Sequence, residues 1–390
     1  MTVFALLSDL HVAAGARWEE GRRVHAAALE KIRERRPDGI LIGGDFHDRR
    51  TLPEERVEGG ELLLNLATVA PVVGIYGNHD APADLHLYNH IGRPGARPIR
   101  FYDTPDVHVL GDTAILALPW DRTPPNPAHI RLPEAARAAA ESEARARLLA
   151  ELADRLDATG AATKLVLSHV MLREAQPGIG QPEIRGGEFV LSLADLAVLR
   201  AHGYLLGHVH KGQDWTIGAA PVVYPGSTHR RTYGELERKY MAFVHCDGPR
   251  VSVEFEELPA TPMMLVETKW EEQEPGRWGF SVPLADLLAD AAGADVRLSY
   301  KVNPAQRDEA ALAADAMLDA LRARGAKLTK PEERVIPAVR ARAPEIALTG
   351  SLEDKLVITM GQKGCPPTDP KHTRVLGLFR TLRSTPLSAT

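Results

Sequence analysis

Side chains that can bind metal ions recur in this 390-residue chain, each directly after a short apolar run. Five segments contain them: Ser8-Asp9-Leu10-His11, Gly43-Gly44-Asp45, Gly77-Asn78-His79-Asp80, Ser168-His169 and Gly207-His208-Val209-His210. A mixture of carboxylate, imidazole and amide oxygen suits manganese, iron or zinc, whereas calcium prefers oxygen ligands alone. The predicted metal ligands are Asp9, His11, Asp45, Asn78, His169, His208 and His210.

Asp45 is the carboxylate that can bridge two ions. The other ligands divide into two groups: Asp9, His11 and His210 on one side, and Asn78, His169 and His208 on the other. Two divalent ions about 3.5–4 Å apart can generate hydroxide and clamp the attacking and leaving oxygens of a phosphate. His79 directly follows a predicted ligand, so it is the predicted catalytic residue that protonates the leaving oxygen or stabilises the phosphorane-like charge, with Asp80 orienting its imidazole.

Each of these motifs has an ordinary structural alternative when it is taken alone. Asp-x-His is common in surface turns, Gly-Asp at a strand end is often a plain turn, and a lone histidine after a strand is usually structural. The combination of five motifs, each at the end of a predicted strand, favours the metal site. The remaining histidines show no such pattern and are predicted to be surface or packing residues, among them His86, His90, His108, His129, His229 and His372.

Short buried strands are predicted to position these side chains. Apolar runs bounded by turn residues occupy residues 3–7, 39–42, 72–76, 164–167 and 204–206. Helical patterns lie between them at residues 19–35, 54–66 and 133–156, and this alternation predicts an α/β layered fold. A hairpin signal at Gly111-Asp112 and strand-like segments at residues 221–224, 240–245 and 251–258 indicate a second packed sheet. Ligands at the carboxyl ends of such strands converge on one point.

The composition changes at Leu258-Pro259-Ala260-Thr261-Pro262, which predicts a domain boundary. The predicted domains are residues 1–258, a smaller α/β unit at 259–342 and a C-terminal segment at 343–390. The smaller unit has strands at residues 265–270 and 296–302 and a helix whose buried face is Ala314, Met317, Leu318 and Leu321. Two short helices are expected at residues 351–360 and 373–382, where they cannot bury much apolar surface without a partner.

The overall composition is that of a globular protein, with 44% apolar and 25% charged residues. No apolar run reaches the length of about 18 residues that a membrane-spanning helix needs, and no signal peptide is recognisable, so a cytoplasmic protein without membrane contact is expected. Only two cysteines occur, which fits a reducing compartment. The net charge of −5 does not indicate a nucleic-acid-binding protein but does not exclude one.

The set of motifs resembles the calcineurin-like metallophosphoesterases over about the first 258 residues. The resemblance implies a two-sheet sandwich flanked by helices and a dinuclear metal centre. Within that family, Asp45-Phe46-His47 followed by Arg49 is similar to the Asp-x-Phe-His motif of SbcD-type DNA exonuclease subunits, which act in double-strand-break repair. The segment from Tyr224 to Arg231, with Gly234-Glu235, resembles the Gly-Ser-x-x-Arg and Phe-Gly-Glu segments of that group.

The chain departs from the nuclease motif at one place. One residue, Phe46, separates Asp45 from His47, where the group usually has two. The resemblance implies that His47 helps to position the catalytic histidine, and this shortening puts its local geometry in question.

The resemblance implies a manganese-dependent nuclease, a double-strand exonuclease and single-strand endonuclease, that cleaves DNA. It also implies a DNA-binding capping domain after residue 258, C-terminal helices that bind the coiled coil of an SbcC-like ATPase, and a homodimer within a heterotetramer. Four arginines are candidates for phosphate contacts, with a solvated surface as the alternative: Arg49, Arg50, Arg230 and Arg231.

Two other functions are consistent with the same residues. A small-molecule phosphodiesterase or phosphatase needs only about 250 residues, so the additional 130 or so argue against it. A non-enzymatic scaffold that tethers a partner would be expected to have lost ligands, whereas this chain keeps all seven and His79.

Overall fold

Two six-stranded sheets carry the predicted metal ligands in the computed structural model, which describes residues 1–122, 132–181, 190–235, 237–336 and 351–384. The first sheet has the order β14-β13-β1-β2-β3-β4, with β1 to β4 parallel and β13 antiparallel to β1. Its strands are β1 (Thr2–Leu7), β2 (Gly39–Ile42), β3 (Val72–Ile75), β4 (Ile99–Tyr102), β13 (Lys239–Asp247) and β14 (Arg250–Leu258).

The second sheet has the order β11-β12-β10-β7-β6-β5. Its strands are β5 (Asp106–Leu110), β6 (Thr113–Leu118), β7 (Thr163–His169), β10 (Gly203–Gly207), β11 (Gln213–Ile217) and β12 (Ala220–Tyr224). A short parallel pair, β8 (Met171–Leu172) and β9 (Val190–Leu191), lies outside it. The five strands predicted to end in ligands are β1, β2, β3, β7 and β10, so that part of the secondary structure is confirmed.

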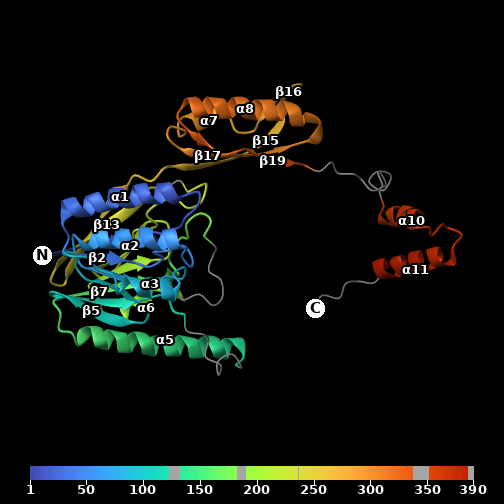
Figure 1. Cartoon of the computed structure of the whole chain (residues 1–390). Helices are drawn as coiled ribbons and strands as arrows, with labels where there is room; N and C mark the ends of the chain where they lie inside the picture. The colour runs from blue at the N-terminus through green and yellow to red at the C-terminus, as the bar shows by residue number, and fades with distance from the viewer. Residues whose placement is uncertain (123–131, 182–189, 236, 337–350, 385–390) are drawn as a thin grey trace.

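Helices cover the outer faces of both sheets, so the molecule has four layers (Figure 1). The first sheet packs on α1 (Trp18–Arg35), α2 (Pro53–Ala67) and α3 (Pro82–Tyr88), and the second on α5 (Glu134–Asp157) and α6 (Leu193–Ala197). Alternate residues of a strand face opposite layers. In β1, Ala5 and Leu7 pack toward the helices, whereas Phe4 and Leu6 pack between the sheets. The predicted two-sheet sandwich flanked by helices is confirmed.

A third sheet follows residue 258 and has its own hydrophobic core. Its elements are β15 (Met263–Glu274), β16 (Arg277–Phe280), α7 (Leu284–Leu288), β17 (Asp295–Val302), η1 (Pro304–Gln306), α8 (Arg307–Ala323), β18 (Lys327–Leu328) and β19 (Glu332–Val335). The predicted helix face is buried against the sheet, with Ala314, Met317, Leu318 and Leu321 in the core. We refer to residues 263–335 as the small unit.

The chain ends with two helices, α10 (Leu352–Gln362) and α11 (Pro370–Ser384), which contact each other. They agree with the two predicted C-terminal helices, although α11 begins three residues earlier than predicted. Among the described residues, no helix is long and apolar enough to cross a membrane.

Candidate metal centre

The carboxyl ends of β1, β2 and β3 meet those of β7 and β10 at one edge of the sandwich. Glycines make this approach possible because a side chain would collide with the facing backbone. A Cβ atom at Gly207, at the end of β10 in the second sheet, would lie 2.0 Å from the carbonyl oxygen of Gly43, which follows β2 in the first sheet. Within the first sheet, a Cβ atom at Gly77 would lie 2.3 Å from the backbone nitrogen of Asp45. The two sheets therefore touch through their backbones at the point where the predicted ligands emerge.

Strained backbone is concentrated at the same point. Asp9, His11, Asp45 and His208 have φ angles of 51°, 46°, 47° and 103°, a region that residues other than glycine rarely adopt. Such conformations cost on the order of 1–3 kcal/mol each and persist at functional sites, where the surrounding structure enforces them. Four of the predicted ligands have this strained backbone. The strain sets the direction in which each side chain points, as is typical of a functional site.

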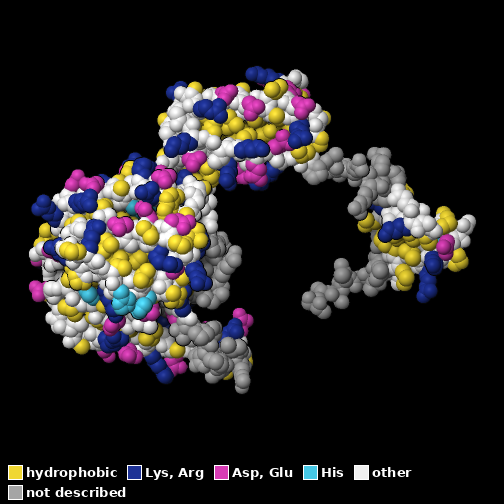
Figure 2. Space-filling model, viewed as in Figure 1, with side chains coloured by type: hydrophobic (Ala, Val, Ile, Leu, Met, Phe, Trp, Pro, Cys, Tyr) yellow, Lys and Arg dark blue, Asp and Glu magenta, His cyan; other side chains and the backbone are white. Residues whose placement is uncertain are grey.

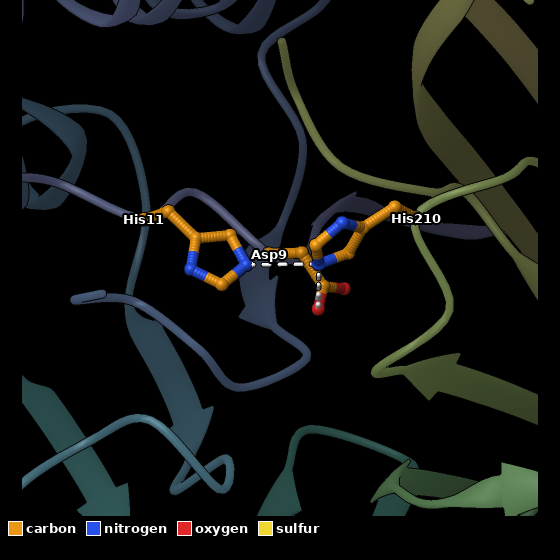
Figure 3. Close-up of side chains that lie close together, drawn as sticks. All are labelled: Asp9, His11 and His210. Carbon is orange, nitrogen blue, oxygen red and sulfur yellow. Dashed lines mark hydrogen bonds and ion pairs between the residues drawn. The ribbon is translucent and has the colours of Figure 1, made fainter. Parts of the chain in front are cut away.

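The first group of predicted ligands is Asp9, His11 and His210, whose side chains point toward one another (Figure 3). Nε2 of His11 lies 3.0 Å from Nε2 of His210, which lies 3.9 Å from Oδ1 of Asp9. Asp9 and His11 are buried, and the backbone N–H of His208 donates to both carboxylate oxygens of Asp9 at 3.2 and 3.1 Å.

The second group is formed around the amide oxygen of Asn78. This oxygen lies 3.0 Å from Nε2 of His169 and 2.9 Å from Nδ1 of His208. Nδ1 of His169 lies 2.8 Å from the Gly43 carbonyl and donates its hydrogen to it, so Nε2 is the nitrogen that faces Asn78 and Asp45.

Asp45 lies between the two groups. Its Oδ1 accepts a hydrogen bond of 2.9 Å from the backbone N–H of His79. Its Oδ2 lies 3.9 Å from Nε2 of His11 and 3.4 Å from Nε2 of His169, which belong to different groups. This is the placement that a bridging carboxylate requires.

The pKa values of the four predicted histidine ligands differ in direction, and the difference follows from burial and from the distance of each ring to Asp45. Burial lowers the pKa of His11, His208 and His210, that of His208 to about 3, so these imidazoles are neutral and able to bind a metal. Burial also lowers the pKa of His169, but the nearby Asp45 carboxylate outweighs this and raises it to about 9. The raised pKa keeps His169 protonated, and its positive charge lies next to the Asp45 carboxylate. A metal cation bound at this position would take over that role and displace the proton. The donor set and its arrangement fit two divalent ions.

A profile of the calcineurin-like phosphoesterase family matches residues 2–212, which is more than half of the chain. The chain belongs to that family. No curated protein sequence matches it significantly. As a calcineurin-like phosphoesterase, the chain is a metal-dependent phosphodiester hydrolase.

Comparison with solved structures finds several that align with about two thirds of this chain. TT1561 of Thermus thermophilus is 14% identical with a TM-score of 0.38, and the match covers 65% of this chain and 98% of that one. GAP50, the anchor in the inner membrane complex of Plasmodium, is 13% identical with a TM-score of 0.40, over 66% and 84% of the two chains. Zinc-bound Vps29 from Entamoeba histolytica is 12% identical with a TM-score of 0.31, over 66% and 98%.

In this calcineurin-like phosphoesterase, His79 is held by Asp48, a residue that the sequence motifs did not indicate. Nδ1 of His79 lies 2.8 Å from the Asp48 carbonyl oxygen and 3.7 Å from its carboxylate. The same carboxylate lies 3.2 Å from Nδ1 of His11 and forms an ion pair with Arg231. Nε2 of His79 lies 4.0 Å from Asp45, and the side chain is 42% exposed, so this nitrogen is available to a substrate.

The expectation that Asp80 orients the imidazole of His79 is wrong, because Asp48 makes that contact. The buried Asp80 carboxylate instead accepts backbone N–H groups of His47 and Gly77, both at 2.9 Å, and of Phe46 at 3.3 Å. Burial, together with the charge of Asp45, raises the pKa of Asp80 to about 7. Asp80 therefore ties the loop after β2 to the loop after β3.

The shortened motif directs His47 away from the metal centre. Its Nδ1 lies 3.0 Å from the Val12 carbonyl and its Nε2 2.9 Å from the Tyr88 hydroxyl, and the residue is buried. Both ring nitrogens are therefore occupied by groups other than His79. The link from His47 to His79 runs through the backbone N–H of His47 and the Asp80 carboxylate.

Replacing Asp48 with asparagine keeps the backbone carbonyl that contacts Nδ1 of His79 but removes the negative charge 3.7 Å from that nitrogen and 3.2 Å from Nδ1 of His11. The change is expected to lower kcat about tenfold to a hundredfold, the usual effect of losing a carboxylate behind a ligand. The side-chain volume is kept, but the negative charge beside His11, His79 and Arg231 is lost. The loss should be larger for a diester with an alkyl leaving group than for one with a nitrophenyl leaving group, because only the former needs protonation by His79. Equal losses for both esters would show that Asp48 does not act through His79.

The four candidate arginines have different environments. Arg231 lines a cavity of about 290 Å³ together with Asp45, Asn78, His79 and His208. Arg49 forms an ion pair of 2.6 Å with Glu55, and Arg50 is exposed. Arg230 is buried and donates to the backbone carbonyls of residues 235, 237 and 260, so it holds the chain together and the expectation that it contacts phosphate is wrong.

A buried ion pair between Lys239 and Glu235 contacts the backbone of His210. Glu235 belongs to the Gly234-Glu235 segment, but no sequence motif indicated Lys239. Lys239 and Glu235 are each 1% exposed, and Nζ of Lys239 lies 2.6 Å from the Glu235 carboxylate. Nζ also donates to the His210 carbonyl and to the Ser227 hydroxyl, both at 3.1 Å. The backbone N–H of His210 donates to the side chain of Gln181 at 2.8 Å.

Replacing Lys239 with methionine should lower the free energy of unfolding by about 3–5 kcal/mol, because the Glu235 carboxylate is left buried without its partner. Urea denaturation of the metal-free protein measures this. Arg238→Met is the matched control, since Arg238 and its partner Glu257 are 70% and 51% exposed and the pair is worth at most about 1 kcal/mol. Similar losses in the two variants would contradict the role assigned to Lys239.

Proposed function

We propose that the chain is a manganese-dependent DNA nuclease of the SbcD type, the catalytic subunit of a complex with a coiled-coil ATPase. In this proposal two manganese ions are held by the ligands predicted from the sequence. Asp45 is shared, the first ion is completed by Asp9, His11 and His210, and the second by Asn78, His169 and His208.

The docking of the small unit beside the metal centre is the observation that carries this proposal. Asp295 of β17 contacts Nη1 of Arg17 at 3.0 Å and the Tyr233 hydroxyl at 2.9 Å. The guanidinium of Arg297, also in β17, lies 4.5 Å from the centre of the Tyr233 ring. Arg17 follows the loop that contains His11, and Tyr233 lies two residues beyond Arg231. The small unit is thus anchored to both segments that border the site, and this supports a substrate larger than a small ester.

In the proposed hydrolysis, His79 and Arg231 have different roles. Two divalent ions, when bound, supply Lewis acidity toward the phosphate and lower the pKa of a water molecule. The Asp48 carbonyl accepts the hydrogen on Nδ1 of His79, so the proton on Nε2 of the imidazolium is the one that can pass to the leaving oxygen. Arg231 lines the same cavity and is positioned to contact a phosphate oxygen.

An assay on linear duplex DNA beside a small nitrophenyl diester tests the proposed substrate. Both are incubated with the manganese-loaded protein, with and without the ATPase partner. The proposal expects DNA cleavage that requires the metal and rises with the partner. Rapid hydrolysis of the small ester without DNA cleavage, even with the partner present, would contradict it.

A small-molecule phosphodiesterase or phosphatase is the second candidate. The net charge of −5 favours it, because affinity for DNA is largely electrostatic. The additional small unit and the C-terminal helices favour the nuclease. The DNA assay separates the two.

The C-terminal helices are the proposed attachment point for the ATPase. Leu352 of α10 and Leu378 of α11 are 64% and 58% exposed, and Figure 2 shows hydrophobic side chains gathered on this pair of helices. Exposed leucines on short helices are typical of a surface that a partner covers. Deletion of residues 351–390 should abolish co-purification with the partner while hydrolysis of a small ester remains.

We also propose that the chain forms a homodimer, and light scattering of the chain alone tests this.

A further inference from the structure

A second cavity, which we call the side pocket, adjoins the metal centre and is not used by the proposed chemistry. Its volume is about 170 Å³, and its walls include His11, Trp18, Gly21, Asp48, His229 and Arg231. Arg231 also lines the cavity over Asp45 and Asn78, so the Arg231–Asp48 ion pair lies where the two cavities meet. A cavity of about 150 Å³ holds a benzene ring, so the side pocket is large enough for one aromatic ring.

Gly21 of α1 lines the side pocket, and its lack of a side chain leaves part of the pocket unfilled. A glycine inside a helix costs about 1 kcal/mol relative to alanine, so its presence needs a reason. A Cβ atom at this position would lie 3.6 Å from Cε1 of His229 and 3.8 Å from its Nε2, which are ordinary contact distances. Packing therefore does not demand glycine here, and its effect is to leave space in front of His229.

A chain of hydrogen bonds fixes which nitrogen of His229 carries its hydrogen. The ring of His25 donates to the Leu10 backbone, and its Nε2 lies 3.0 Å from the Thr228 hydroxyl, which lies 3.2 Å from Nδ1 of His229. Burial lowers the pKa of His25 to about 4, so its ring is neutral and Nε2 can only accept the hydrogen of Thr228. The Thr228 oxygen then accepts a hydrogen from Nδ1 of His229.

Nε2 of His229 is consequently left as a hydrogen-bond acceptor at the wall of the side pocket. His229 is 2% exposed, and no partner contacts Nε2 within the described parts of the chain. Because His229 lines the pocket, a hydrogen-bond donor of a ligand bound there can reach this nitrogen. Trp18 adds an aromatic side chain on which a ring can pack. The wall also contains four arginines, and each of them is paired with a carboxylate: Arg17 with Asp295, Arg22 with Glu58, Arg49 with Glu55 and Arg231 with Asp48.

We propose that the side pocket is a subsite for the base of the nucleotide whose phosphate lies over the metal centre, with an N–H group of the base donating to Nε2 of His229. This rests on the proposed function in that it assumes a nucleotide substrate, and it adds a contact to the terminal nucleoside. A base carries a ring that the side pocket can hold and a donor that Nε2 of His229 can accept. Its phosphate would lie in the adjoining cavity over Asp45 and Asn78, which Arg231 also lines.

Calorimetric titration of the full-length, manganese-loaded protein tests this proposal without DNA cleavage. The probes are deoxycytidine 5′- and 3′-monophosphate, each paired with the deoxyribose phosphate that lacks the base. The wild type should bind at least one nucleotide about tenfold more tightly than its baseless counterpart, as base stacking alone allows. Gly21→Leu fills the pocket and should reduce this ratio to about one. Ala26→Leu places the same leucine side chain at an exposed position of α1 and should leave the ratio at about ten.

His229→Phe keeps an aromatic ring but removes the acceptor, so it should lower the ratio even if Gly21→Leu does not fold. Equal binding of nucleotide and sugar phosphate by the wild type, or an unchanged ratio in a folded Gly21→Leu protein, would overturn the subsite. Base discrimination without DNA cleavage would retain the subsite and contradict the nuclease. Cleavage of DNA without base discrimination would retain the nuclease and contradict the subsite.

Discussion

Replacing Asp45 with asparagine is expected to lower phosphodiester hydrolysis by about a thousandfold or more, because an essential part of both proposed metal sites is lost. Oδ2 of Asp45 lies 3.9 Å from His11 in one group and 3.4 Å from His169 in the other. Two bound ions contribute several kcal/mol of transition-state stabilisation, and each 1.4 kcal/mol or so is a factor of ten in rate. The variant should bind at most one manganese ion per chain, measured by elemental analysis after dialysis.

The matched control is Asp112→Asn, which makes the same chemical change at an exposed position in the β5–β6 hairpin. It should keep the metal content and turnover of the wild type. If Asp45→Asn retains two ions per chain and more than a tenth of the activity, Asp45 does not bridge the ions.

Replacing His79 with asparagine is expected to lower kcat about 10²- to 10⁴-fold on a substrate with an alkyl leaving group, the range for loss of a general acid. Nδ1 of His79 is fixed by Asp48, and its side chain is 42% exposed toward the substrate side. The loss should be much smaller on a nitrophenyl diester, whose leaving group departs without a proton. Metal content should not change, because the predicted ligands remain.

His86→Asn provides the control for this variant, since His86 is exposed on α3 and its ring contacts that of His90 rather than a predicted ligand. Losses of equal size on the two substrates would mean that His79 stabilises charge instead of donating a proton. A loss of bound metal would mean that it acts as a ligand.

The strands that carry the site, and the ligands at their ends, could be predicted because both are visible in short stretches of the sequence. Buried parallel strands appear as short apolar runs, and a residue that can bind a metal follows each of the five runs within three positions. Since the carboxyl ends of such strands lie at one edge, the convergence of Asp9, Asp45 and His169 followed from chain order alone. The two-sheet arrangement followed from the same signals with the later strand-like segments.

The supporting residues could not be predicted in this way because their contacts join distant segments. Asp48 contacts His79 across two loops, and the positive φ of Asp45 turns the chain so that His47 points into the core while Asp48 faces the site. Lys239 reaches His210 from β13. His229 was predicted to be a surface or packing residue, and it is indeed buried, but its place in the wall of the side pocket left no signal in the sequence.

Anomalous diffraction from crystals of the manganese-loaded protein tests the dinuclear centre most directly. Two manganese peaks about 3.5–4 Å apart are expected, with the Asp45 carboxylate between them. His11 and His210 should lie at one peak, and His169 and His208 at the other. A single peak, or two peaks of which only one contacts Asp45, would contradict the shared two-metal site.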